Sequence, residues 1–329
     1  MRFVLFFSVL ALVFVNGWTD APNAIAGVVA TGGMRYRSAA WMAAGCNIAG
    51  ALAFSLFGGQ VAKTVLGLAD FSRLGFQGLC ALAGCFLAVV LFAAAAWLWG
   101  IPTSESHGLM AGILGSGLAL GQTGIFRWRD WQPVLAGLFL SLGLGFLLGL
   151  VLYRLAGSFL QNLCPRRINR WQRAGAAANA LMHGGQDGQK FAVMLQLVWA
   201  ALAASPAGTE KPQAAAVFFC AAAMGLGTLC GGRRIIQKTA VEMVQIDPSQ
   251  SIAADLASAG ALLSLSLMGL PVSTTHTKTA ALAGCASARS RRSVDTGVVG
   301  QMLAAWLFTF PCCAALAWCL TRLLLALSS

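Results

Sequence analysis

The chain has 329 residues, of which 58% are hydrophobic and only 10% are charged, whereas a typical soluble protein has about 25% charged residues. This composition excludes a soluble globular protein. At about 20 apolar residues for each helix that crosses a bilayer, the length accommodates around ten spans or partial spans. We therefore expect an all-α polytopic membrane protein, with the lipid bilayer as its main partner.

The charge is strongly positive and lies mostly between the apolar segments. Twenty-two lysines and arginines against ten acids give a net charge of +12. Short basic loops are typical of the cytoplasmic side of a membrane protein. No base-reading motif accompanies them, so we expect no nucleic-acid partner. The basic clusters are Arg35 and Arg37; Arg166, Arg167, Arg170 and Arg173; Arg233 and Arg234; and Arg289, Arg291 and Arg292.

Apolar segments follow one another along the chain, at about 3–15, 38–57, 76–99, 107–121, 133–156, 188–204, 213–230, 252–270, 276–287 and 297–327. A strongly basic connection separates the fifth segment from the sixth. The sequence predicts about ten to twelve transmembrane or re-entrant helices. They divide into a first membrane repeat (1–160), a basic cytoplasmic linker (161–173) and a second membrane repeat (174–329).

Three motifs recur in the same order on either side of the linker. Asn16-Gly-Trp-Thr-Asp20-Ala-Pro-Asn23 matches His183-Gly-Gly-Gln-Asp187-Gly-Gln-Lys190, with Asp187 lying 167 positions after Asp20. Gly231-Gly232 follows Gly58-Gly59 by 173 positions, and the motif from Pro271 to His276 follows that from Pro102 to His107 by 169. Three ordered matches at nearly one offset indicate an internal duplication.

The loop charges indicate that the two repeats are inverted. Arg35 and Arg37 follow the first motif, whereas the matching loop 205–212 carries only Glu210 and Lys211. Residues 60–64 hold one base where 233–238 hold three. A basic loop that matches a poorly charged one is expected when the second copy crosses the membrane in the opposite direction. The loops at 127–129 and 289–292 are both basic and fit this pattern less well.

Four acids lie within or at the edge of apolar segments: Asp20, Glu105, Asp187 and Asp255. At mid-membrane each Asp costs about 2.5 to 3.5 kcal/mol. A loop position or a nearby base would explain such an acid, and Lys190 lies one helical turn after Asp187. Asp20 has no base closer in sequence than Arg35, which favours a functional role for its carboxylate.

The two proline motifs predict half-helices that begin inside the membrane. Proline favours the first turn of a helix, and hydroxyl side chains that follow it can cap the helix N-terminus. Two positive helix ends that face each other would form an anion site. Its expected ligands are Ser104, Ser106, Ser273, Thr274 and Thr275, together with Asp20 and Asp187.

The Asp20 and Asp187 motifs are rich in Gly, Asn and Gln, which loosen a helix and expose carbonyl groups. Carboxylate, amide and carbonyl oxygens suit Na⁺ or a transferred proton. Anion donors beside cation acceptors predict ion-coupled uptake of an oxyanion, without an organic cofactor. The candidates for coupling-ion binding or charge compensation are Asp20, Asn23, Glu105, Asp187, Lys190 and Asp255, with Na⁺ possible at Asp20, Asn23 and Asp187.

All three histidines of the chain, His107, His183 and His276, lie in the repeated motifs. We expect them to pack, or to hydrogen-bond the end of a broken helix. Proton relay is the alternative role, because the imidazole titrates near neutral pH.

At these residues the chain resembles the inorganic phosphate transporter (PiT) family, whose two signatures are an Asn-Asp motif in each half and a later Pro-x-Ser-x-x-His motif. The resemblance covers nearly the whole sequence, and the Asp-Gly-Gln-Lys form is similar to bacterial low-affinity members. It implies symport of inorganic phosphate with H⁺ or Na⁺ by alternating access between inverted repeats. A homodimer in a bacterial inner membrane is also implied, with no enzymatic activity.

Several residues depart from the family pattern and bear on the coupling ion. Thr19 and Gln186 stand where family members often carry Asn, and Asn47 stands where Na⁺-coupled relatives have an acid. The resemblance of the Asp-Gly-Gln-Lys form to bacterial low-affinity members that are thought to use protons favours H⁺. Lys190 occupies the place that Asn23 has in the first repeat, so it is a candidate for a tethered cation that replaces Na⁺. Glu105, at the place of Thr274, is predicted to accept a proton or to cap the helix at Ser104.

Other functions stay open at this point. Sulfate or another oxyanion is the nearest alternative substrate, although a carboxylate near the site favours phosphate, which can donate hydrogen bonds. An intramembrane serine hydrolase with Ser273 and His276 is less well supported, because the chain offers two symmetric half-sites and no Gly-x-Ser-x-Gly motif. A structural scaffold would have no use for buried acids.

Overall fold

The computed structural model describes residues 1–71, 74–100, 103–203, 213–231, 236, 246–289 and 296–327. The described part is helical, and its one β-type pairing is an isolated bridge between Ala69 and Phe126. Helices satisfy their backbone hydrogen bonds internally, as a bilayer requires. The all-α membrane class that the composition predicts is therefore confirmed.

The helices of the first half begin with a broken one. α1 (Arg2–Thr19) ends at Asp20, and the chain continues through a short 3₁₀ turn η1 (Ala21–Ile25) into α2 (Ala26–Ala30). The rest of this half comprises α3 (Tyr36–Phe57), α4 (Gln60–Gly67), α5 (Gly75–Leu98), α6 (Glu105–Ala119), the turns η3 (Thr123–Ile125) and η4 (Trp128–Trp131), and α7 (Gln132–Gln161).

The second half begins with α8 (Pro165–Ala203), a continuous helix of 39 residues. The basic segment 161–173 is thus largely helical, since most of it forms the first turns of α8. The remaining helices are α9 (Ala214–Cys230), α11 (Pro248–Leu267), α12 (Thr274–Arg289) and α13 (Thr296–Ala326).

Six stretches of the described chain are helical, long and apolar enough to cross a membrane, so the protein is a multi-pass membrane protein. The stretches in α7 and α13 are the least covered by the rest of the molecule. Both expose large apolar side chains, among them Phe139, Leu155 and Leu307. The six stretches are Arg2–Ala30, Tyr36–Leu56, Gly75–Leu98, Trp128–Gln161, Pro248–Leu267 and Val299–Ala326.

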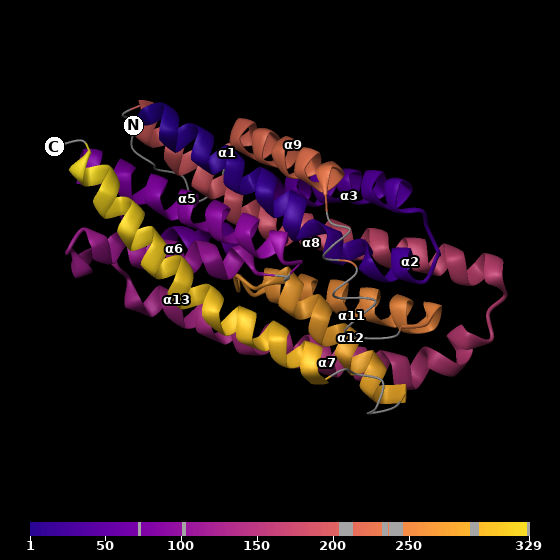
Figure 1. Ribbon diagram of the computed structural model, residues 1–329. Helices are drawn as coiled ribbons and strands as arrows, with labels where there is room; N and C mark the ends of the chain where they lie inside the picture. Colours follow the sequence, from indigo (N-terminus) through magenta and orange to yellow (C-terminus); the bar gives the residue numbers. More distant parts are fainter. Residues whose placement is uncertain are drawn as a thin grey trace.

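The two halves run in opposite directions and interlock. In Figure 1, α1 and α8 run opposite ways along the molecule, as do α3 and α9, and α7 and α13. α7 packs on α11 and α12 of the second half, while α13 packs on α5 and α6 of the first. α3 likewise packs on α8, and α9 on α1. Each half therefore completes the packing of the other, and the inversion that the loop charges predict is seen in the fold.

Glycines allow the closest of these contacts. A Cβ at Gly184 of α8 would lie 2.1 Å from the carbonyl oxygen of Asn47 on α3, and one at Gly50 of α3 would lie 1.9 Å from that of Leu181. No side chain fits at such distances. The prediction that the glycines around Asp187 loosen the helix is wrong: α8 is continuous there, because these glycines serve the close approach of α3.

The proline motifs also differ from the prediction. α12 begins at Thr274, three residues after Pro271, so this proline precedes the helix and does not occupy its first turn. Pro102 lies outside the described residues. In both halves a serine, Ser104 or Ser273, lies directly before the first helical residue and supplies the capping oxygen.

Candidate functional site

α6 and α12 begin near the middle of the molecule and run to opposite ends (Figure 1). Each N-terminus is capped in the same way. The Ser104 hydroxyl accepts a hydrogen bond from the backbone N–H of His107 at 3.2 Å, and the Ser273 hydroxyl accepts one from that of His276 at 3.2 Å. Both serines are buried. Two positive helix ends are thus brought to the interior without a charged cap, which favours an anion nearby.

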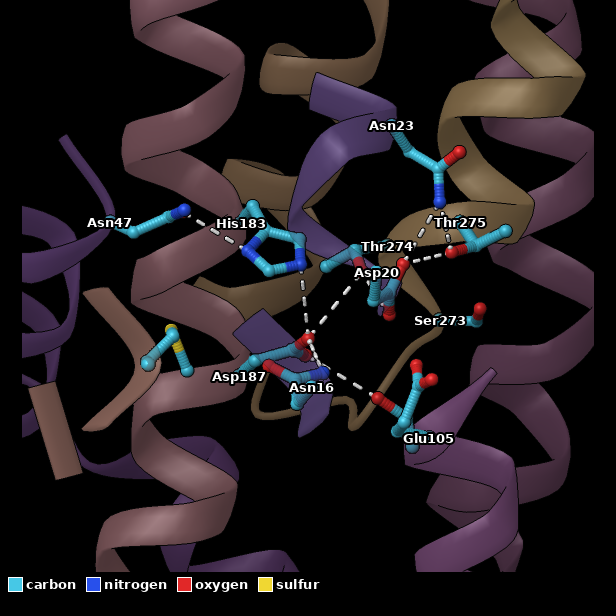
Figure 2. A network of polar contacts seen from close by, with 12 residues as sticks. Asn16, Asp20, Asn23, Asn47, Glu105, His183, Asp187, Ser273, Thr274 and Thr275 are labelled. Carbon is cyan, nitrogen blue, oxygen red and sulfur yellow. Dashed lines mark hydrogen bonds and ion pairs between the residues drawn. The ribbon is translucent and has the colours of Figure 1, made fainter. Parts of the chain in front are cut away.

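Asp20, at the break after α1, bonds mainly to the N-terminus of α12. Its carboxylate accepts from the Thr274 hydroxyl at 3.1 Å and forms a short hydrogen bond with the Thr275 hydroxyl. The Asn23 amide donates to Asp20 at 3.2 Å and to Thr275 at 2.9 Å. Figure 2 shows these four side chains pointing toward one another. A carboxylate of the first half is therefore held by hydroxyls of the second.

Asp187, in the middle of α8, reaches the first half in a corresponding way. Its carboxylate accepts from Ser106 of α6 at 3.3 Å and from the Asn16 amide of α1 at 3.0 Å. His183 Nε2 lies 3.4 Å from it, and Thr274 Oγ1 lies 3.5 Å away. Thr274 contacts both aspartates, so the structure brings Asp20 and Asp187 together.

Lys190 lies one turn after Asp187 and is completely buried. Its ammonium donates to Asp187 Oδ1 at 2.6 Å, to the Ser106 hydroxyl at 2.5 Å and to the backbone carbonyl of Val272 at 2.6 Å. An ammonium has three N–H donors, and each has an oxygen partner here. The buried charge of Asp187 is therefore paired and hydrogen-bonded, as burial of a charge requires.

Glu105 points toward Asp20 and Ser273 from the first residue of α6 (Figure 2). Its Oε1 lies 2.5 Å from the Thr19 hydroxyl, which also lies 2.8 Å from the carbonyl of Val15. A hydroxyl has one proton to donate. Both contacts are satisfied when Thr19 donates to Val15 and a protonated Glu105 donates to Thr19. The other oxygen, Oε2, is buried without a partner.

The three histidines have different surroundings. His183 Nδ1 lies 3.1 Å from the amide oxygen of Asn47, so this ring connects Asn47 with Asp187 (Figure 2). The rings of His107 and His276 lie 4.6 Å apart between centroids, and Trp306 lies 3.9 Å beyond His276. Two of the three predicted histidines therefore pack against each other.

Asp255 has a different partner. It forms a short ion pair with Lys278 of α12, and both side chains are buried. Within the part of the chain that the structure describes, its hydrogen bonds lead to Lys278 and not to Asp20 or Asp187.

Several buried polar atoms around the two aspartates have no partner in the protein. More than 90% of buried polar groups in proteins are hydrogen-bonded, so a cluster of unpaired ones indicates a place for a polar ligand. The atoms near the aspartates are Asn16 Oδ1, Asn23 Oδ1 and Glu105 Oε2. In the separate pair of His107 and His276, His107 Nε2 and both ring nitrogens of His276 also have no partner. The oxygens suit a cation or a proton donor, and a ring nitrogen can either accept or donate.

Asn16, Thr19 and Asn47 take part in this network, although residue types alone did not single them out as site residues. The repeat offset contains a signal for one of them. Asn16 is the counterpart of His183, 167 positions earlier, and both contact Asp187. The backbone carbonyl of Val272, which accepts from Lys190, could not be found from the sequence, because every residue has a backbone carbonyl.

Comparison with known proteins agrees with this arrangement. The model of the phosphate transporter family matches twice, over residues 16–171 and 161–317, which shows the internal repeat. Probable low-affinity inorganic phosphate transporters of Rhizobium meliloti and Bacillus subtilis are 32% and 30% identical. The matches cover 92% and 93% of this chain, and 90% and 92% of the relatives. The chain belongs to the phosphate transporter family, a family of transporters and not of enzymes.

The fold is also that of a solved structure. A sodium-dependent phosphate transporter matches with a TM-score of 0.88 over 99% of both chains, at 18% sequence identity. The low identity limits this likeness to the fold, so the residues that bind ligands must be inferred from this chain.

Proposed function

We propose that this protein carries inorganic phosphate across the membrane together with a coupling cation, by alternating access. One observation carries the proposal: two capped helix N-termini and two carboxylates from opposite halves meet in the interior, beside polar atoms that have no partner. The family and the names of the relatives agree with phosphate as the substrate.

The hydroxyls and helix ends supply donors for the anion. Ser104 and Ser273 use their oxygens to cap the helices, and their own protons stay available for phosphate oxygens. Thr274, Thr275 and Ser106 now bond to Asp20 and Asp187, and they reach phosphate by exchanging these bonds. The aspartates accept hydrogen bonds from protonated phosphate. Sulfate has no such proton at neutral pH, so the site favours phosphate over sulfate.

The coupling ion is H⁺ or Na⁺. Asp20, Asp187 and His183 each place a ligand atom within 4.8 Å of the others, a spacing that a bound cation can bridge. The unpaired oxygens of Asn23 and Asn16 add neutral ligands of the kind that Na⁺ takes. The buried Glu105 supports H⁺, because its carboxyl group, with Oε1 at 2.5 Å from the Thr19 hydroxyl, can hold a coupling proton. The cation offsets phosphate charge in a medium of low dielectric constant.

Uptake into proteoliposomes tests the proposal. Purified protein is reconstituted, and labelled phosphate uptake is measured under an imposed H⁺ gradient and, separately, under an imposed Na⁺ gradient. We expect concentrative uptake with at least one of the two, and little inhibition by excess sulfate. Uptake that neither gradient drives, or that sulfate abolishes at equal concentration, contradicts the proposal.

The remaining features of the assembly follow from the resemblance and the charge pattern. The two relatives from Rhizobium meliloti and Bacillus subtilis are bacterial, which supports the bacterial inner membrane as the location. Residues 1–160 and 174–329 form the two transport repeats, and the basic residues 161–173 lie on the cytoplasmic side. The family resemblance favours a homodimer. The mass of the purified protein, measured in detergent or nanodiscs, distinguishes a monomer from a homodimer.

A further inference from the structure

The environment of Lys190 has the composition of a cation-binding site. A carboxylate, a hydroxyl and a backbone carbonyl converge on its ammonium at 2.5 to 2.6 Å. These are the oxygen types that hold a hard metal cation in proteins. A neutral amine has only two N–H donors and would leave one of the three oxygens facing a lone pair. These three oxygens, which we call the cage, therefore suit a charged ammonium group such as that of Lys190.

The first half contains the counterpart of this cage without the lysine. Asp20 corresponds to Asp187, Thr275 to Ser106 and Asn23 to Lys190 by the repeat offsets. Asp20 and Thr275 are hydrogen-bonded to each other, and the Asn23 amide contacts both. The Asn23 oxygen is buried without a partner. A cation that enters here finds a carboxylate, a hydroxyl and an amide oxygen.

The two aspartates therefore differ in charge compensation. Asp187 has a permanent ion-pair partner in Lys190, at 2.6 Å. No lysine or arginine among the described residues forms an ion pair with Asp20. An unpaired buried carboxylate is costly, whereas a paired and fully hydrogen-bonded one is tolerated.

We propose that Lys190 is a built-in cation that permanently fills the cation position of the second half, so that only the position around Asp20 takes up a mobile coupling cation. This inference rests on the proposed function, because it assigns the coupling stoichiometry of the same site. A carrier with two empty positions needs two cations for each phosphate; this chain needs one fewer.

The test restores the missing symmetry. In Lys190→Asn, both halves carry an Asp and an Asn, and the cage around Asp187 loses its ammonium. We expect this variant to bind Na⁺ in the vacated cage. In detergent without phosphate, Na⁺ should raise the Tm of the variant by about 2 °C more than that of the wild type, at a Na⁺ concentration tenfold above Kd. K⁺ of equal concentration controls for ionic strength.

Two further variants keep the result interpretable. Lys278→Asn removes another buried lysine, whose hydrogen bond among the described residues goes to Asp255. Within the described part of the chain, the position that it vacates lacks the three converging oxygens found around Lys190, so this variant should show no extra response to Na⁺. Lys190→Asn combined with Asp187→Asn removes the carboxylate as well and should abolish the extra response. Lys190→Met, a neutral side chain of similar length, replaces Lys190→Asn if that variant does not fold.

Reconstituted variants give a second measurement. The uptake of Lys190→Asn should fall at least tenfold in Na⁺-free buffer and should recover when Na⁺ is added. An identical Tm response in wild type and variant, or uptake with unchanged ion dependence, overturns the inference. Wild-type uptake tests the proposed function separately, because Na⁺ binding in detergent needs no transport.

Discussion

The two halves of the molecule share a fold but differ in how they hold their aspartates. In the first half the helix breaks at Asp20, and the carboxylate is bonded by hydroxyls and an amide. In the second half the helix continues through Asp187, and a lysine one turn later neutralises it. A duplicated fold thus places two carboxylates in corresponding positions, while a single residue, Lys190 against Asn23, decides which of them has an ion-pair partner in the chain.

Helix geometry explains why Asp187 has a lysine partner and Asp20 does not. Lys190 reaches Asp187 because an unbroken helix places residues three apart on the same face. After Asp20 the chain turns through η1, and Asn23 reaches both Asp20 and Thr275 from that turn. The second half therefore gains an ion pair within one helix, and the first half holds its carboxylate with neutral side chains at a helix break.

The largest expected effect is on stability and separates the two aspartates. Asp187→Asn leaves the buried Lys190 without its counter-ion, which costs about 3 to 5 kcal/mol in free energy of unfolding. Asp20→Asn removes hydrogen bonds to a charged group but strands no cation, and should cost about 1 to 2 kcal/mol. Thermal unfolding of both variants in detergent compares them. Equal losses would show that Lys190 does not depend on Asp187.

The next prediction concerns the contact between the halves. Gly50→Ala places a methyl group against the backbone of Leu181 and should destabilise the protein by about 1 to 3 kcal/mol through overpacking. Gly45→Ala, on the same helix, meets open space and is the matched control. We expect it to be neutral or slightly stabilising, since Ala favours a helix over Gly. If both variants unfold at the same temperature, α3 and α8 are not in this close contact.

Much of this arrangement could be predicted from the sequence, and the reason is the repeat. The repeated motifs singled out Asp20, Asp187 and the hydroxyls of Ser106 and Thr275 as ligands of one site, and the structure brings these residues together. Helix capping is a local property of Ser104 and Ser273, so the hydroxyls that follow each proline were enough to predict the two caps. The proline itself did not mark the first residue of α12.

Other features depend on packing and could not be predicted. Glycine does not show where a helix ends, because Gly17 and Gly184 both serve close contacts with a neighbouring helix and only the stretch at Asp20, which contains Pro22, is broken. Asp255 resembles the other buried acids in composition, and only the fold shows that Lys278 neutralises it. The two halves thus differ through tertiary contacts that the sequence does not show. At Asp187, however, the difference comes from one residue, Lys190.

Glu105 offers a further comparison, because its counterpart in the second half is the neutral Thr274. If Glu105 carries the coupling proton, Glu105→Gln should reduce H⁺-driven phosphate uptake about tenfold or more and remove its dependence on the imposed pH gradient. The amide keeps the size of the side chain and can still donate to Thr19, so the fold should be retained. Uptake with an unchanged pH profile would leave only the capping role at Ser104.

The smallest expected effect concerns His276, which can be set against His183. The His276 ring packs between His107 and Trp306, and neither ring nitrogen has a partner. Replacing unpaired buried polar atoms with apolar ones of the same shape is nearly neutral. His276→Phe should therefore lower uptake by less than about threefold, whereas His183→Phe should lower it far more, because that ring connects Asn47 with Asp187. Initial rates of phosphate uptake, normalised to reconstituted protein, compare the two. A loss in His276→Phe as large as that in His183→Phe would mean that the His276 nitrogens contact the transported ions, and the site would then extend from the two aspartates to the histidine pair.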